Sequence, residues 1–163
     1  MKRPMVILRI FTAIVSLCPI SYGLSNDYYE FSEDGKECII KRYDTPVPWL
    51  NFLNNDLFQT WITNTGNFEA FMLDRRINAL TNPEESSGYV YIRDRDDGQY
   101  FMINKPASGA KWQCRHGLGY TTLETSRLDL SASVTYYVPR DDNVLVWLVT
   151  IQNNSSTERH LDV

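Results

Sequence analysis

Apolar and polar side chains alternate along residues 127–138. A period of two is that of a β-strand with one buried and one solvated face, because successive side chains point to opposite sides of a sheet. The pattern therefore predicts a strand over residues 127–138 in an antiparallel sheet. Its buried face would carry Leu128, Leu130, Ala132, Val134, Tyr136 and Val138.

The run at residues 144–149 is apolar at every position, which predicts a central strand buried on both faces. Residues 139–143 and 153–157 predict polar turns on either side of it, and residues 159–163 predict the start of a further strand. An unpaired strand at the end of a chain leaves an edge open to aggregation. We therefore expect the chain to be a truncated piece, cut at its C-terminus from a longer domain.

Turn signals that contain glycine separate several shorter apolar runs. Glycine accepts the positive φ that tight hairpin turns require. Three hairpins are predicted on this basis: residue 31 with 38–40 around Asp34-Gly35, 89–92 with 100–103 around Asp97-Gly98, and 59–64 with 68–73 around Gly66. No sustained helical period occurs after the first 23 residues, so the sequence predicts an all-β sandwich.

Aromatic residues make up 13% of the 163 residues, a share that suits both a pleated sheet and the stacking of sugar rings. The length fits one globular domain with its own core. The formal net charge is −4, so the chain lacks the basic field that nucleic acid or an anionic membrane surface would attract. We expect no nucleic-acid partner.

The first 23 residues differ from the rest. Lys2 and Arg3 precede an apolar run at residues 10–20, and the small residues Ser21 and Gly23 follow it, as in a signal peptide. The alternative is a start codon assigned too far upstream. The run is too short for a stable membrane span, which takes about 20 apolar residues. We expect a mature β-sandwich domain over residues 24–163, exported if the leader is real.

Cys38 and Cys114 remain once such a leader is removed. They would either pair in an oxidising compartment or serve as small buried hydrophobes. The chain has only two histidines and no CxxC spacing, so no metal site is expected. We expect no bound cofactor.

The carboxylates do not form an evident catalytic pair. They cluster in turns beside arginines, where solvated surface charge is the expected role; the clusters are Asp94, Asp96 and Asp97, and Asp141 with Asp142. A glycosidase would need its acid in a cleft of low polarity. His116 and His160 stand in no recognisable nucleophile motif.

Residues 112–121 concentrate the candidate binding chemistry. Arg115 carries a planar fork of donors, and Tyr120 and Trp112 offer aromatic faces, which suits sugar hydroxyls and ring faces. Alternatively Arg115 and His116 fasten a sharp β-corner whose glycines allow the bend. The Asn64-Thr65-Gly66 segment has the same two interpretations, a polar loop facing a sugar or a plain turn. From the residues alone the structural interpretation is stronger for both segments.

Five segments resemble, in order and spacing, motifs of glycoside hydrolase family 94, formerly glycosyltransferase family 36. The segments are 43–53 (YDTPVPWLNFL), 62–66 (ITNTG), 89–94 (YVYIRD), 114–121 (CRHGLGYT), and 138–139 together with 144–153. The family contains cellobiose, chitobiose and related phosphorylases. Here Gly66 is followed by Asn67, where the family usually continues a glycine-rich run.

The resemblance implies the amino-terminal domain of such an enzyme, an antiparallel β-super-sandwich of the galactose mutarotase-like type. In the family this domain precedes a helical barrel that holds the active site and performs inverting phosphorolysis. Inorganic phosphate attacks the anomeric carbon of a β-linked disaccharide while an Asp in the barrel protonates the glycosidic oxygen. The resemblance thus implies no catalytic residue in this chain and no activity of the chain alone.

The resemblance also implies a homodimer in which the sandwich lends loops to the substrate end of the partner's active site. Arg115, His116, Tyr120, Asn64 and Thr65 are the candidate substrate-edge residues, and cytoplasmic location is the family habit. Two alternatives stay open: a free-standing, non-catalytic carbohydrate-binding sandwich, and a structural domain from a transferase such as a cyclic glucan synthase.

Overall fold

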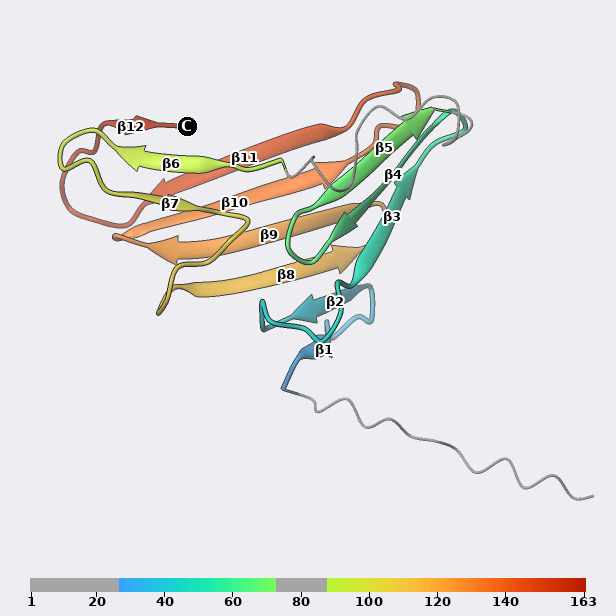
Figure 1. Cartoon of the computed structure of the whole chain (residues 1–163), viewed down its shortest axis with the longest axis horizontal. Helices are drawn as coiled ribbons and strands as arrows, with labels where there is room; N and C mark the ends of the chain where they lie inside the picture. Colours follow the sequence, from blue (N-terminus) through green and yellow to red (C-terminus); the bar gives the residue numbers. More distant parts are fainter. Residues whose placement is uncertain (1–26, 73–87) are drawn as a thin grey trace, which may run out of the picture.

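A computed structural model describes residues 27–72 and 88–163 (Figure 1). These residues form twelve β-strands and no helix, which confirms the predicted all-β class. The strands are β1 (Tyr29–Phe31), β2 (Glu37–Ile40), β3 (Leu50–Asn54), β4 (Phe58–Thr63), β5 (Phe68–Met72), β6 (Tyr91–Asp94), β7 (Tyr100–Met102), β8 (Lys111–Gly117), β9 (Tyr120–Arg127), β10 (Leu130–Tyr137), β11 (Val146–Asn153) and β12 (Leu161–Asp162).

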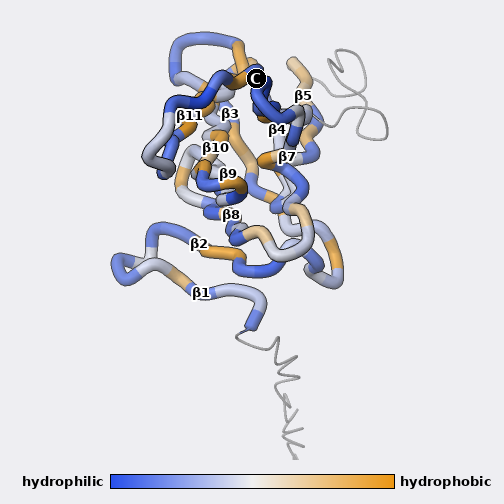
Figure 2. Tube along the Cα trace, turned by 90° about the vertical axis from the view of Figure 1, so that its left-hand side faces the viewer, coloured by the Kyte–Doolittle hydropathy of each residue, from blue (hydrophilic) through white to orange (hydrophobic). Residues whose placement is uncertain are grey.

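The strands form one six-stranded sheet and two three-stranded sheets, all antiparallel. The large sheet has the order β1-β2-β8-β9-β10-β11, and the small ones are β12-β6-β7 and β3-β4-β5. The two small sheets lie over one face of the large sheet (Figures 1 and 2). A shared core fills the space between the layers, with Ile40, Leu123 and Val134 from the large sheet meeting Ile62 and Ile92 from the small ones.

Buried polar side chains also join the layers. Asn104 follows β7, and its Nδ2 donates to the Tyr136 hydroxyl on β10 at 2.8 Å, while its Oδ1 accepts from the Val90 amide at 3.0 Å. Burial raises the pKa of Tyr136 to about 12, so this phenol stays neutral and can accept the amide proton. These bonds satisfy polar groups that would otherwise be costly to bury.

The predicted hairpins are present. β1 pairs with β2 around Gly35, β6 with β7 around Gly98, and β4 with β5 around Gly66, and all three glycines have positive φ. The further strand expected near the end is β12, and it is paired with β6. The leader at residues 1–23 and Leu73, which was included in one hairpin, lie outside the described residues.

The prediction of one strand over residues 127–138 is wrong at its start. Leu128 and Asp129 form a two-residue turn, both with positive φ (56° and 58°), and they connect β9 to β10. From Leu130 onward the alternation holds: Leu130, Val134 and Tyr136 are buried. Strands β8 and β9 themselves were not predicted from the pattern.

Strand β11 is not a central strand buried on both faces, as residues 144–149 had suggested. It pairs only with β10 among the described strands, and the Leu148 side chain, which points away from the core, is 56% exposed. Trp147 and Val149 face the core. The apolar run therefore reflects one buried face and one open apolar face.

Asp94 is not the solvated turn carboxylate that its neighbours suggested. It is 2% exposed, it pairs with Arg159, whose Nε donates to Oδ2 at 2.6 Å, and its Oδ1 accepts from the Asp96 amide at 2.8 Å. The Asp96 amide and then the Arg159 guanidinium lower the pKa of this carboxyl. Asp94 therefore fastens the segment before β12 to β6.

Cys38 and Cys114 are both free thiols on the core side of adjacent strands. Cys114 is fully buried, and burial raises the pKa of its thiol well above the usual value, so it serves as a small core residue. Among the described residues, no helix has the length and apolar character needed to cross a membrane.

Candidate functional site

The β8–β9 hairpin carries the densest group of predicted site residues. Its turn is Leu118-Gly119, and Gly119 takes a φ of +88°, which side-chain-bearing residues rarely adopt. A Cβ on Gly117 would meet the ring of Tyr120, its cross-strand partner, with Cε2 only 2.8 Å away. The turn therefore requires Gly119, and a side chain at position 117 would displace the Tyr120 ring that lies across the backbone of β8.

Arg115 and Tyr120 meet on the outer face of the large sheet, the face away from the core. Both bind Glu37 on β2: the Arg115 guanidinium pairs with one carboxylate oxygen, and the Tyr120 hydroxyl donates to the other. The Glu37 side chain is only 11% exposed. Hydrogen bonds from Arg115 and then Tyr120 lower the pKa of Glu37, so it stays ionised and holds both partners.

We call Glu37, Arg115 and Tyr120 the outer cluster. The sequence analysis did not select Glu37. Its position on β2 places it on the same face as Ile39 and on the face opposite to the core residue Ile40, so it points away from the core. The Arg115 side chain remains 33% exposed, so the cluster is open to solvent on the outer face. The cluster can therefore present guanidinium and phenol groups to a polar ligand.

His116 lies on the opposite face of β8. It contacts the Trp49 carbonyl through Nε2 at 3.3 Å and the Thr121 hydroxyl through Nδ1 at 3.0 Å. A carbonyl only accepts, so Nε2 carries the proton and Nδ1 accepts from Thr121. Burial lowers the pKa of His116 to about 4, which keeps the ring neutral. The imidazole thereby ties the loop before β3 to the hairpin.

Asn64 is fully buried between two segments. Its Oδ1 accepts from the Trp49 amide at 2.9 Å, its Nδ2 donates to the Thr45 hydroxyl at 3.0 Å, and its backbone amide donates to the Trp49 carbonyl at 2.8 Å. Thr65 lies in the β4–β5 turn, where its hydroxyl meets that of Thr63 at 2.9 Å. These contacts hold the turn; a substrate-edge role for Asn64, Thr65 and His116 stays a prediction.

Asn51, which sequence reasoning missed, joins this network from β3. Its Nδ2 lies within hydrogen-bonding distance of the Gly117 carbonyl (2.9 Å), the Tyr120 carbonyl (2.8 Å) and the Thr121 hydroxyl (3.1 Å). The amide thus bridges the two layers at the hairpin end. An amide within the otherwise apolar run LNFL was the signal available in the sequence.

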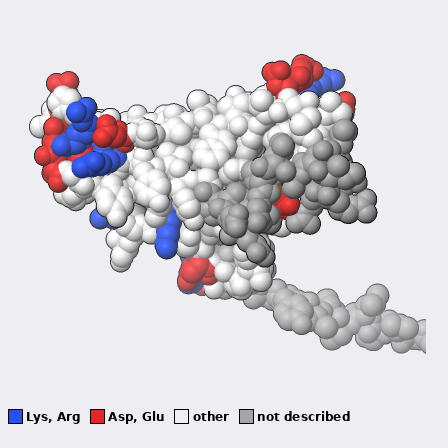
Figure 3. Space-filling view, turned by 45° about the horizontal axis from the view of Figure 1, so that its top comes forward, with Lys and Arg blue, Asp and Glu red and all other residues white. Residues whose placement is uncertain are grey.

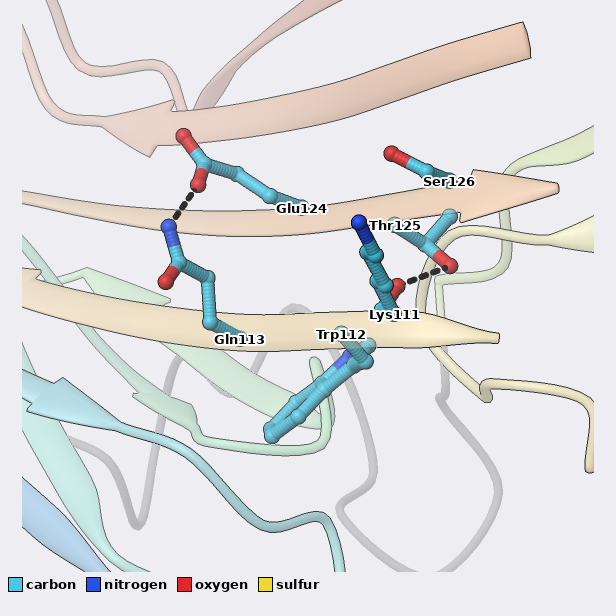
Figure 4. A pocket seen from close by; sticks show the side chains of 6 residues that line it. All are labelled: Lys111, Trp112, Gln113, Glu124, Thr125 and Ser126. Atoms are coloured by element: carbon cyan, nitrogen blue, oxygen red, sulfur yellow. Dashed lines mark hydrogen bonds between the residues drawn. The ribbon is translucent and has the colours of Figure 1, made fainter. Parts of the chain in front are cut away.

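A hollow of about 250 Å³ lies farther along the outer face (Figure 4). Gln113 and Glu124 face each other across β8 and β9 and are hydrogen-bonded, and Lys111 and Ser126 border the hollow on the other side. A second hollow of about 290 Å³ shares Glu124, Thr125 and Ser126 and continues over β10 and β11. Its other lining residues are Ser131, Ala132, Ser133, Thr150 and Gln152.

Over β9 and β10 the outer face therefore carries mainly hydroxyl and carboxylate groups. Further pairs continue the pattern between strands, with the Thr122 and Thr135 hydroxyls 2.9 Å apart and the Ser126 and Ser131 hydroxyls 3.1 Å apart. Such groups bind neutral polyols such as sugars. Within the described residues no group of three or more His, Cys, Asp or Glu side chains could hold a metal ion.

On the face shown in Figure 3, the charged side chains of the described residues gather mainly toward the two ends of the molecule. The end at β6 and β12 is mixed in sign; there an ion pair joins Arg159 to Asp94, and His160 Nδ1 lies 3.2 Å from Asp96 Oδ1.

Residues 36–163 match the sequence profile described as Glycosyl hydrolase 94, supersandwich domain. The chain belongs to glycosyl hydrolase family 94. The family-94 match takes in the outer cluster, the β8–β9 hairpin and nearly all the described strands, and it agrees with the antiparallel sheets.

Curated relatives of this family-94 chain are named as phosphorylases and as a synthase. It is 32% identical over 143 residues to an N,N′-diacetylchitobiose phosphorylase of Vibrio proteolyticus, covering 81% of this chain and 18% of that protein. It is 29% identical over 147 residues to a solabiose phosphorylase of Paenibacillus borealis, covering 82% and 19%. A cyclic β-(1,2)-glucan synthase of Rhizobium meliloti (strain 1021) is 27% identical over 154 residues, covering 85% and 5%. The chain thus spans less than a fifth of the length of each of these relatives.

Proposed function

We propose that this chain is the amino-terminal carbohydrate-binding and assembly domain of an inverting glycoside phosphorylase. The whole enzyme would cleave a β-linked disaccharide with inorganic phosphate and release a sugar 1-phosphate. The observation that carries the proposal is the match of residues 36–163 to the family-94 supersandwich domain, joined with relatives named as disaccharide phosphorylases. No cofactor is required, because phosphate itself is the second substrate.

The chain's own part in this reaction is binding and not bond cleavage. Inverting phosphorolysis needs an acid that protonates the leaving oxygen and a phosphate placed on the opposite face of the sugar. Glu37 is ionised and held by two partners, so it is a positioning group and no proton donor. In the proposal the solvent-facing part of Arg115 and the Tyr120 ring form an edge of the sugar site in a homodimer.

The decisive experiment compares two proteins: the 163-residue chain and the longest in-frame product of its gene. Each is incubated with inorganic phosphate and N,N′-diacetylchitobiose, cellobiose or solabiose. We expect the longer protein to release a sugar 1-phosphate, detected by ³¹P NMR, with inversion from the β-linkage to the α-anomer, detected by ¹H NMR. We expect the chain alone to release none.

Three results would contradict the proposal. Phosphate-dependent cleavage by the 163-residue chain would place the chemistry inside it, and retention of configuration would remove the inverting mechanism. A gene whose frame stops after Val163 would leave only the alternative of a free-standing carbohydrate-binding sandwich. That alternative predicts sugar binding with no phosphate-dependent turnover.

The similarity to a cyclic β-(1,2)-glucan synthase favours a second candidate, a structural domain of a much larger glucan-forming enzyme. It differs from the first proposal in what the longer gene product does. Formation of cyclic glucan without net release of a sugar 1-phosphate from disaccharides would support the second candidate and contradict the first.

A further inference from the structure

The sheet β3-β4-β5 has an outer face that lies apart from the outer cluster and from the hollows of the large sheet. Its three strands place side chains in cross-strand rows, and one row runs from Phe52 on β3 through Trp61 on β4 to Glu69 on β5. The next row runs from Asn54 through Gln59 to Phe71. Neighbouring side chains in such rows have Cβ atoms about 5 Å apart, so three aromatic rings and two amides share a small area.

All of these side chains except Glu69, which is 2% exposed, line a hollow of about 220 Å³. Its walls are Phe52, Asn54, Gln59, Thr60, Trp61 and Phe71. Phe52 is 68% exposed, so a large aromatic surface faces outward where burial would normally be favoured. The volume is below the range of about 300–1,000 Å³ typical of sites for drug-sized ligands, and it suits a ligand the size of one ring.

The Trp61 ring is fixed in place. Its Nε1 donates to Glu69 Oε2 at 3.1 Å, so the polar edge of the indole is satisfied and its face is left for packing. An aromatic side chain held by a hydrogen bond loses little entropy when a ligand binds, which favours affinity. Trp61 therefore provides a preorganised face.

The side-chain amides of Asn54 and Gln59 can form hydrogen bonds with a ligand in the hollow. Within the described part of the chain, the side chains of Asn54 and Gln59 make no hydrogen bond, although each can donate two and accept two. They flank the rings in the Asn54–Gln59–Phe71 row. A ligand that stacks an apolar face on the rings could bond its own hydroxyls to these amides.

Among the residues that the structure describes, those lining the hollow include no Lys, Arg, Asp or Glu, so they offer no charged partner to a phosphate group, a nucleotide or a charged peptide. A neutral ring with an apolar face and a rim of hydroxyls matches all of these features. A pyranose ring is such a molecule, since its axial C–H groups form an apolar face and its hydroxyls project from the rim. A purely apolar protein surface would leave both amides unpaired at a cost.

We propose that the outer face of β3-β4-β5 is a saccharide-binding surface, with Phe52 and Trp61 stacking on a neutral pyranose ring of an oligosaccharide and Asn54 and Gln59 bonding its hydroxyls. This surface lies on a different sheet from the outer cluster. It does not rest on the proposed function, because it requires no phosphorolysis.

The test is an NMR titration of the ¹⁵N-labelled 163-residue chain with cellobiose and, separately, with N,N′-diacetylchitobiose. The indole cross-peak of Trp61 is assigned by its absence in Trp61→Phe. We expect this peak to shift and saturate with a millimolar Kd. Phe52→Ala and Gln59→Ala are each expected to raise the Kd about three- to tenfold, the size of one aromatic contact or one hydrogen bond.

Phe31→Ala is the matched control. Phe31 on β1 is a phenylalanine of nearly equal exposure, 64%, on another sheet, and its loss should leave the Kd unchanged. The proposal is overturned if the Trp61 peak does not move up to the solubility limit of both sugars, or if Phe31→Ala weakens binding as much as Phe52→Ala does. It is also overturned if the Trp61 peak shifts with protein concentration alone, because that result assigns the face to self-association.

Failure here and failure of the proposed function are separable. Phosphorolysis by the longer protein without sugar binding at Trp61 would remove this surface and keep the enzyme. Binding at Trp61 with no phosphorolysis would keep the surface and favour a binding module.

Discussion

Gly66 combines two requirements that no other residue type meets. Its φ is +81°, and a Cβ at this position would collide with the Asn104 amide and lie 2.8 Å from Leu123 Cδ1. Asn104 cannot yield freely, because it bonds Tyr136 and Val90. We predict that Gly66→Ala lowers the free energy of unfolding by about 2–4 kcal/mol, the sum of a strained backbone and an overpacked core, as measured by urea denaturation.

Gly35→Ala isolates the packing part of this effect. Gly35 also has a positive φ, +71°, but nothing lies within 4 Å of its potential Cβ. We expect it to cost about 1 kcal/mol from backbone strain alone. Equal losses for the two variants would show that the close approach to Asn104 is unimportant.

Glu37 supports a second prediction at this scale. Glu37→Gln removes the charge that Arg115 and Tyr120 share, and it replaces two charge-assisted hydrogen bonds at a nearly buried position by weaker neutral ones. We expect the free energy of unfolding to fall by about 1–3 kcal/mol in urea denaturation. Glu33→Gln, in the exposed turn before β2, should change it by less than about 0.5 kcal/mol. A similar small change for both would mean that the outer cluster contributes nothing to stability.

At the level of elements, the β9–β10 turn is held in a costly conformation. Leu128 and Asp129 both have positive φ, as in the turn type that normally takes Asn-Gly. Asp129→Gly removes one of these penalties, and we predict that it raises the free energy of unfolding by about 1 kcal/mol. Asp141→Gly, in the loop before β11, serves as control and should give no gain. Thermal and urea unfolding would both reveal the difference, and a loss in Asp129→Gly would contradict the prediction.

The same hairpin explains where sequence reasoning succeeded and failed. The core face of β10 is Leu, Ala, Val and Tyr, so its alternation was visible. The core face of β9 includes Thr121 and Thr125, which are buried because their hydroxyls find His116 Nδ1 and the Lys111 carbonyl. Buried threonines conceal a strand from a hydrophobicity pattern. Leu128 also fits the alternation of β10, so the hydrophobic pattern did not reveal the turn at residues 128–129.

The candidate site was also predicted only in part from the sequence. The sequence identified residues 112–121 as special, and the hairpin there does join Arg115 to Tyr120. It could not identify Glu37 or the rows on β3-β4-β5, because both depend on which strands become neighbours. Strand β2 lies beside β8 although more than seventy residues separate them in sequence.

For the whole molecule, His116 predicts how stability depends on pH. Burial lowers its pKa from the ordinary 6.5 to about 4 in the folded chain. Between these values the unfolded chain binds a proton that the folded chain does not, so the free energy of unfolding falls as the pH falls. The loss starts near pH 6.5 and is complete below pH 4, and a difference of this size corresponds to about 3 kcal/mol at most.

The measurement is urea denaturation at several pH values between 5 and 7, above the range in which ordinary carboxyl groups titrate. The unaltered chain should lose stability steadily across this interval as the pH falls. The free energy of unfolding of His116→Gln should be lower at pH 7 but should depend much less on pH, because the variant lacks the imidazole whose pKa is lowered by burial. His160→Gln, whose imidazole is 62% exposed, should keep the slope of the unaltered chain. If His116→Gln keeps the full slope instead, the neutral imidazole between Trp49 and Thr121 is not what couples protonation to unfolding.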